Sequence, residues 1–284
     1  MKKLAKAAAI ISAVLLLFAL LVGALYRVFT DNEWVKKEYE RIDIEAQSGY
    51  TPEQASYVLG AMMDYSIGSF DDLDKVAVEE NGESVLFFNE SELSHMVDVR
   101  ALTTGVLKLG LAALILGLAL FAFAFIVLTH DSLKSASRAF LIALGVLIVI
   151  IIALGIWMAI DFDSFWTMFH VVFLDLESST FDPAVSRMIN ICPAELFSDI
   201  IKHFALITGL ALIIPVGLAI LFLCLKKRTD HTLLRKLGFI FGFIWLVFIM
   251  CNILTDLRAF ILAGLPVALM GLAFQFASAV RREK

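Results

Sequence analysis

Six long apolar stretches constrain this chain more than any other feature of its sequence. They lie at about 7–29, 101–129, 138–160, 204–225, 236–254 and 258–280. A helix of roughly 20 apolar residues crosses the hydrocarbon core of a bilayer, where the backbone must satisfy its own hydrogen bonds. Each stretch is therefore predicted to be a transmembrane helix. The composition agrees, because 60% of the residues are hydrophobic and only 18% are charged.

The basic residues predict how these spans are oriented. Lysine and arginine gather at the N-terminus, at about 129–138, at 226–236 and at the C-terminus. With six spans, all four groups lie on one side, and short cytoplasmic loops carry an excess of such residues. We therefore expect a multi-pass protein of a cytoplasmic membrane with both termini in the cytoplasm. The first stretch is too long for a signal peptide and is interpreted as an uncleaved span.

Two acidic regions between the spans are then expected outside the cytoplasm. Region 31–100 has seventeen Asp or Glu residues and region 161–203 has seven. In the first, the pattern favours a helix over Pro52–Ile67 and a hairpin over Val76–Phe88, with Asn81-Gly82 at its turn. We expect a small cap packed on the second region rather than an independent domain. The predicted class is an all-α polytopic membrane protein with a small extracytoplasmic α+β cap.

Three short patterns predict helix starts beside the spans. Asn89 and Glu92 have the spacing of a capping box, and their helix would run directly into the second span. Asp182-Pro183 is typical of a helix N-cap followed by proline at the first helical position. Pro193 is expected to start a helix that continues into the fourth span.

The helix that begins near Asn89 carries the first candidate site. Glu92, His95 and Asp98 follow one another at intervals of three, on neighbouring parts of one helix face. A carboxylate beside an imidazole fixes its tautomer and supports its protonated form, which is how a general base is usually built. The alternative is a polar helix start where the chain leaves the lipid.

His170 is the second candidate, and it follows Phe165, Trp166 and Phe169. This aromatic setting places it at or just below the boundary between lipid and water. A neutral imidazole there costs little to bury and can act as a base, although a lone interfacial histidine more often only packs. His203 begins the fourth span on the same side; it is either a third neighbour or an interfacial residue, and we favour the second interpretation.

The sequence patterns of several functional classes are absent from this chain. The chain has no dinucleotide-binding glycine motif, P-loop, Cys-x-x-Cys or His-Glu-x-x-His, and its apolar stretches lack the deep acidic residues of ion-coupled transporters. We expect no cofactor, no metal and no nucleic-acid partner. Two alternatives to an enzyme stay open: a scaffold whose cap binds a partner, and a metal or b-type haem protein that uses His95, His170 and His203.

These histidine motifs resemble those of the lipoprotein intramolecular transacylase (Lit) family of Gram-positive bacteria. The resemblance rests on Glu92-Leu93-Ser94-His95-Met96-Val97-Asp98-Val99 before a span, Phe165-x-x-x-Phe169-His170-x-x-Phe173, Phe181-Asp182-Pro183 and Ile189-x-x-x-Pro193. It covers roughly 1–225, and 226–284 is expected to be an additional C-terminal transmembrane hairpin.

The resemblance implies an acyltransferase. Characterised members move the sn-2 acyl chain of a diacylglyceryl lipoprotein to the amine of its N-terminal cysteine, which gives a lyso-form lipoprotein. By motif, His170 is implied as the main catalytic residue, with His95 and Asp98 in or beside the site. Substrate contacts are expected from Trp166, Phe169 and Arg100, the last as an anion or headgroup contact. The partners would be membrane lipids and diacylglyceryl lipoproteins, and the oligomeric state is open.

Overall fold

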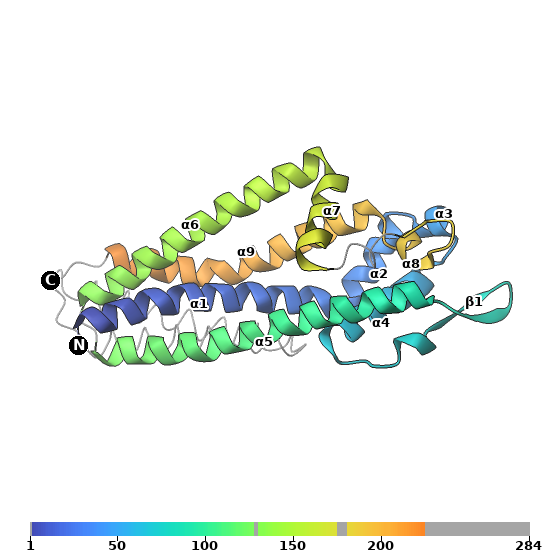
Figure 1. The fold of residues 1–284 in the computed structure, drawn as a ribbon. Helices are drawn as coiled ribbons and strands as arrows, with labels where there is room; N and C mark the ends of the chain where they lie inside the picture. The colour runs from blue at the N-terminus through green and yellow to red at the C-terminus, as the bar shows by residue number, and fades with distance from the viewer. Residues whose placement is uncertain (1, 128–129, 175–180, 225–284) are drawn as a thin grey trace. The chain divides into compact units, whose positions relative to one another are not determined.

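A computed structural model describes residues 2–127, 130–174 and 181–224 (Figure 1). The described elements are, in order, α1 (Lys2–Phe29), α2 (Asn32–Arg41), α3 (Ile44–Ser48), α4 (Pro52–Ile67), η1 (Leu73–Lys75), β1 (Ala77–Glu80), β2 (Glu83–Leu86), α5 (Glu90–Val127), α6 (His130–Ile160), α7 (Phe162–Phe173), α8 (Arg187–Asn190) and α9 (Ala194–Cys224). The described part of the chain is mostly helical, and its two strands form one small antiparallel sheet.

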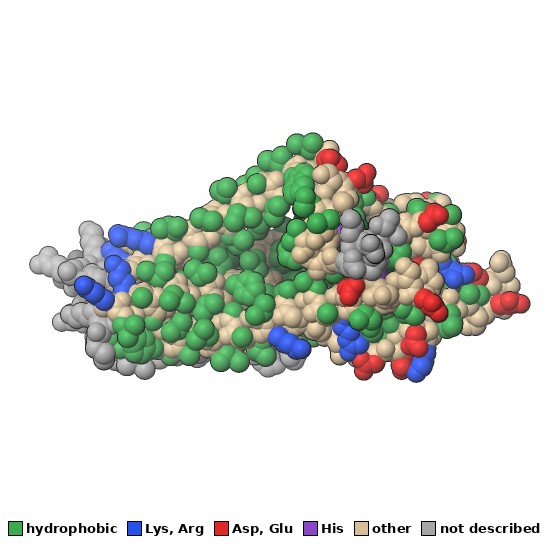
Figure 2. All heavy atoms as spheres, in the orientation of Figure 1, with side chains coloured by type: hydrophobic (Ala, Val, Ile, Leu, Met, Phe, Trp, Pro, Cys, Tyr) green, Lys and Arg blue, Asp and Glu red, His purple; other side chains and the backbone are tan. Residues whose placement is uncertain are grey.

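Four of these helices are long and apolar enough to cross a membrane. The candidate spans are Lys3–Phe29, Glu90–Ala124, Lys134–Ile160 and Ala194–Ile220. They contain most of the first four predicted stretches, and hydrophobic side chains cover much of the long helices in Figure 2. The two predicted spans at 236–254 and 258–280 lie outside the described residues.

The chain divides into two compact units, which are described one at a time. Among the described residues, one unit comprises 2–24, 110–127, 130–146 and 207–224. In it, small residues let α1 and α5 approach closely, as helices do in membranes. A Cβ atom on Gly110 would lie only 2.4 Å from Val22 Cγ1. Glycine at this position is therefore required by packing.

Replacing Gly110 with alanine is expected to destabilise this packing by about 1–3 kcal/mol, the usual cost of overfilling a packed interface. The stiff Val22 side chain would have to move, because its Cβ would also lie 2.8 Å from the new methyl group. Thermal unfolding in detergent measures the effect. Gly145→Ala is the matched control, since no described atom lies within 4 Å of a Cβ there. Equal melting temperatures for the two variants would contradict the prediction.

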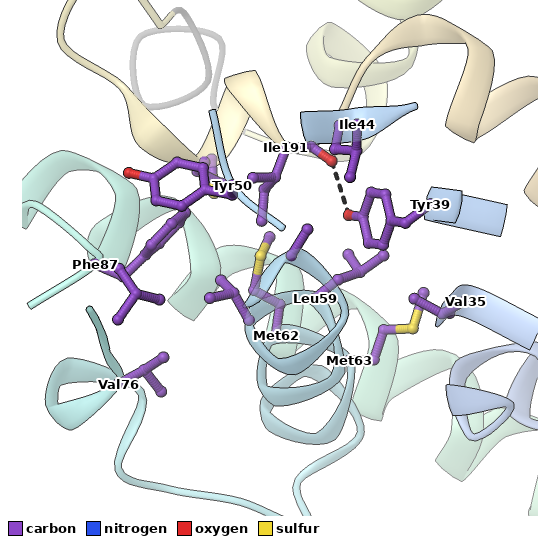
Figure 3. Packing of buried hydrophobic residues seen from close by; sticks show 14 of the residues in the cluster. Val35, Tyr39, Ile44, Tyr50, Leu59, Met62, Met63, Val76, Phe87 and Ile191 are labelled. Atoms are coloured by element: carbon purple, nitrogen blue, oxygen red, sulfur yellow. Dashed lines mark hydrogen bonds between the residues drawn. The ribbon is translucent and has the colours of Figure 1, made fainter. Parts of the chain in front are cut away.

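The second unit comprises Leu25–Leu109 and Leu147–Leu206 and contains the cap. Its core joins α2, α4 and the hairpin to the segment before α9 (Figure 3). Tyr39 is fully buried and donates a hydrogen bond to the carbonyl oxygen of Ile191 at 2.7 Å. The prediction that the first acidic region packs on the second is therefore confirmed.

Local sequence explains two elements of the cap. Thr51 and Gln54 form a capping box ahead of α4, Pro52 occupies its first turn, and Gly68 ends it with φ of +83°. The predicted helix over Pro52–Ile67 is confirmed. In the hairpin, Asn81 and Gly82 have φ of +54° and +83°, as a two-residue turn between twisted strands requires. The predicted hairpin is also confirmed.

The predicted helix start at Asp182-Pro183 is wrong. Asp182 Oδ1 accepts a hydrogen bond from the backbone N–H of Ala184, and the Asp182 carbonyl oxygen accepts from Val185 and Ser186. An aspartate that bonds its own following backbone stabilises a turn in competition with a helix. Helix α8 begins later, at Arg187. The prediction for Pro193 is confirmed, since α9 begins at the next residue.

Candidate active site

Helix α7 carries His170 in the second unit. Asp161 starts this helix by accepting a hydrogen bond from the backbone N–H of Ser164 at 3.0 Å. His170 is only 4% exposed, whereas its neighbours Val171 and Val172 are exposed. The helix therefore turns its histidine inward and presents an apolar face outward, as a helix lying at a membrane interface does.

Helix α5 carries His95. The predicted capping box is confirmed: the Asn89 N–H donates to Glu92 Oε2 at 2.8 Å, and the Glu92 N–H donates to Asn89 Oδ1 at 2.9 Å. The helix continues without interruption into the second span. His95 is 7% exposed, so its position is fixed both by the helix start and by burial.

The two imidazoles lie against each other. Their ring centroids are 5.8 Å apart and their planes are 24° from parallel. His170 Nδ1 lies 2.8 Å from the Trp166 carbonyl oxygen. Because a carbonyl only accepts, Nδ1 carries the hydrogen, and in the neutral form of the imidazole Nε2 then has a lone pair. His95 Nδ1 is buried, with no hydrogen-bond partner in the described part of the chain. Such a pair can take up and release a proton.

Aromatic rings surround the pair. The rings of Trp166 and Phe169 pack edge-on against His170, with centroids 4.6 and 5.6 Å away. Phe181 packs edge-on against His95 at 5.3 Å. These rings restrict the access of water to the imidazoles and give the site an apolar lining.

Phe197 is a site residue that the sequence analysis missed. It lies on the first turn of α9, and its ring centroid is 4.4 Å from that of Trp166. The sequence feature that pointed to Phe197 was its position four residues after Pro193, where a new helix is expected to start. That spacing gave no indication that α9 would pack on α7.

The carboxylate expected beside His95 is Asp98 rather than Glu92. Glu92 is fully buried, and its Oε1 accepts hydrogen bonds from Ser186 Oγ at 2.6 Å and from the Met188 N–H at 2.9 Å. Asp98 is half-buried and lies about one turn after His95 on α5. A catalytic role for Asp98 stays a prediction.

Arg100 has partners of its own in the cap. Its Nη2 forms an ion pair with Asp71 Oδ1 at 2.6 Å, and its guanidinium lies 4.7 Å from the centre of the Tyr65 ring. These contacts tie α5 to the end of α4 and the segment after it. The expected contact between Arg100 and a substrate headgroup stays a prediction.

His203 packs elsewhere and does not join the histidine pair. Its ring stacks on Trp34 with a centroid distance of 4.4 Å, and its Nε2 lies 3.3 Å from Asp31 Oδ2. The interpretation of His203 as an interfacial residue fits these contacts. Within residues 2–127, 130–174 and 181–224, no group of three or more His, Cys, Asp or Glu side chains is arranged to hold a metal ion.

The thiol of Cys192, a half-buried residue, is unsuited to nucleophilic attack. Burial raises its pKa to about 12, and the charge of Glu92 acts in the same direction. A thiol with this pKa stays protonated near neutral pH, and only the thiolate is a good nucleophile. Covalent catalysis through Cys192 is therefore disfavoured, and the histidine pair stays the candidate chemical centre.

Four apolar helices long enough to cross a membrane, a small cap and a buried histidine pair describe an integral membrane protein with a candidate site for acid–base chemistry. The sequence profile of the lipoprotein intramolecular transacylase Lit matches residues 10–197. The chain belongs to this family.

Solved structures show the same fold. The chain is similar to an in meso structure of the membrane integral lipoprotein intramolecular transacylase Lit from Bacillus cereus, with a TM-score of 0.60 and 17% identity over 78% of this chain and 94% of that one. Two structures of that protein with a histidine changed to arginine or alanine give TM-scores of 0.53 and 18% identity, over 78% of this chain and 88% and 90% of theirs. A search of curated proteins found no match.

Proposed function

We propose that this chain moves the sn-2 acyl chain of a diacylglyceryl lipoprotein onto the α-amine of its N-terminal cysteine, giving a lyso-form lipoprotein. Membership of the Lit family supports the reaction class. The single observation that carries the proposal is the contact between His95 and His170, with Nδ1 of His170 held by the Trp166 carbonyl. The Nε2 lone pair of His170 is then available for the substrate.

The substrate brings both reacting groups on one molecule, so much of the cost of bringing them together is already met. In the proposed step, His170 Nε2 takes a proton from the cysteine amine, and the amine nitrogen attacks the ester carbonyl carbon. A carbon–nitrogen bond forms and the carbon–oxygen bond to glycerol breaks. The proton ends on the glyceryl oxygen, which leaves as a hydroxyl group.

His95 is proposed to assist this transfer. Its buried Nδ1 has no hydrogen-bond partner in the described part of the chain, and a buried polar atom without a partner is costly. The reacting ester or the leaving oxygen would supply that partner. Trp166 and Phe169 are proposed to line the path of the acyl chain, and Asp98 to stabilise positive charge on the pair.

Mass spectrometry of N-terminal lipopeptides tests this function. The protein is expressed in a host that makes diacyl lipoproteins, and the peptides are compared with those from the same host without it. A lyso-form product, with one ester chain and one amide chain, is the expected result. Unchanged diacylglyceryl peptides, with the protein confirmed in the membrane, would overturn the proposal and favour a scaffold.

We also propose six spans with both termini in the cytoplasm. The four basic clusters support this orientation, and 226–284 would then be a separate transmembrane hairpin. A reporter fused after Lys284 should be cytoplasmic, and one fused after Thr255 should be extracytoplasmic. A cytoplasmic result at both positions would contradict six spans while leaving the proposed reaction intact.

A further inference from the structure

Glu92 is a buried carboxylate whose hydrogen bonds reach far along the chain. Its Oε2 accepts from the Asn89 N–H, which closes the capping box of α5. Its Oε1 accepts from Ser186 Oγ and from the Met188 N–H, in a segment more than 90 residues away. A charged group is costly to bury unless it is fully hydrogen-bonded. The two donors from Ser186 and Met188 therefore bind the 186–188 segment to the start of α5.

The same segment is rigidly connected to Phe181. The Asp182 carbonyl oxygen accepts hydrogen bonds from the Val185 and Ser186 N–H groups at 3.0 and 2.9 Å. Asp182 Oδ1 also accepts from the Ala184 N–H at 2.9 Å. This turn fixes the distance between the anchored Ser186 and the residue that precedes Asp182. Phe181 is therefore held in place from one side by the anchor at Ser186.

Phe181 contacts His95 from this anchored position. The two ring centroids are 5.3 Å apart, and the planes meet at 76°. The contacts form a closed path from Glu92 to Ser186, through the turn to Phe181, and across to His95, which lies three residues after Glu92 on α5. We propose that Glu92 is a positioning residue: it holds Phe181 edge-on against His95 and so keeps that imidazole facing His170.

This inference rests on the proposed transacylase function and adds a residue that contacts neither imidazole directly. Both oxygens of Glu92 are hydrogen-bonded to Asn89, Ser186 and Met188, so this carboxylate is not free to bind the substrate. Its effect is therefore expected on the rate of the chemical step. Losing the anchor would let Phe181 and His95 shift relative to His170. A displacement of about 1 Å in a reacting group can cost about 100-fold in rate. We therefore expect kcat to fall about 10- to 100-fold in Glu92→Ala, with little change in KM.

A double-mutant cycle separates positioning from general destabilisation. The purified full-length protein is assayed in lipid vesicles with a synthetic diacylglyceryl lipopeptide, and kcat and KM are measured for Glu92→Ala, Phe181→Ala and the double variant. If Glu92 acts through Phe181, the double variant loses no more than the poorer single variant. Multiplying losses, or a change confined to KM, would overturn the inference.

Two further variants keep the test decisive if Glu92→Ala fails to insert. Ser186→Ala removes one donor from the far end of the anchor and should reduce kcat in the same way, without adding to Phe181→Ala. Ser91→Ala is the matched control, since Ser91 is exposed on the first turn of α5 and takes no part in the bonds among Glu92, Ser186 and Met188; it should keep the wild-type kcat. Full activity in Ser186→Ala would also overturn the inference. A wild-type protein that forms no lyso-form product would instead overturn the proposed function.

Discussion

Replacing His170 with alanine is expected to lower the rate of lyso-form lipoprotein formation by at least about 100-fold, the lower end of what general acid–base catalysis contributes. The imidazole is buried, its Nδ1 is fixed at 2.8 Å from the Trp166 carbonyl oxygen, and its Nε2 is left for the substrate. Alanine removes the proton acceptor without adding charge or bulk. The product is measured by mass spectrometry of lipopeptides from membranes with equal amounts of each protein.

His95→Ala should cause a comparable loss, because the two rings work as one unit. The double variant should then be no slower than the poorer single variant, since groups that act together are not additive. His203→Phe is the matched control: an aromatic ring can still stack on Trp34, and Asp31 keeps its ion pair with Arg27 at 3.3 Å. Normal activity in His170→Ala, or equal losses in all three single variants, would contradict the assignment.

The spans and the local elements of the cap were predictable from sequence because their causes are local. A transmembrane span can be recognised from about twenty consecutive apolar residues. The hairpin turn at Asn81-Gly82 and the capping box of Asn89 with Glu92 depend only on residues a few positions apart. Asp182-Pro183 shows the limit of this approach, because the same two residues are compatible with a helix start and with the turn that forms.

The candidate site was only partly predictable because its geometry is made by contacts between distant segments. His95 and His170 were both named as candidates, but nothing in their spacing indicates that their rings meet. The pattern at intervals of three placed Glu92 beside His95, whereas the structure gives the Glu92 carboxylate to Ser186. A sequence shows which face of a helix a residue shares, and tertiary packing decides which partner it takes there. Phe197 could not be identified as a site residue from the sequence for the same reason.

The aromatic wall beside His170 leads to the second large effect. Trp166 contacts the His170 imidazole through its backbone and through its side chain. The Trp166 carbonyl oxygen accepts the Nδ1 hydrogen, and the centroid of the indole ring lies 4.6 Å from that of the imidazole. The same indole ring packs on Phe197, with centroids 4.4 Å apart. Trp166→Ala keeps the carbonyl and removes these two ring contacts, together with the stacking of Trp166 on Phe162 and Phe169. At about 0.5–1.5 kcal/mol for each of the contacts to His170 and Phe197, the loss in kcat/KM should be about 10- to 100-fold.

The pattern of losses tests whether the ring itself is responsible. Trp166→Phe retains a ring at the same place and should recover most of the activity, whereas Trp166→Leu, which is apolar but not aromatic, should recover less. Trp157→Ala is the matched control. It also removes a tryptophan ring, but this ring packs edge-on against Phe165, with centroids 5.6 Å apart, instead of against His170. Initial rates with a diacylglyceryl lipopeptide in vesicles distinguish these variants. If Trp157→Ala and Trp166→Ala lose activity equally, the tryptophans serve general stability, and the orientation of His170 must depend on its bond to the backbone alone.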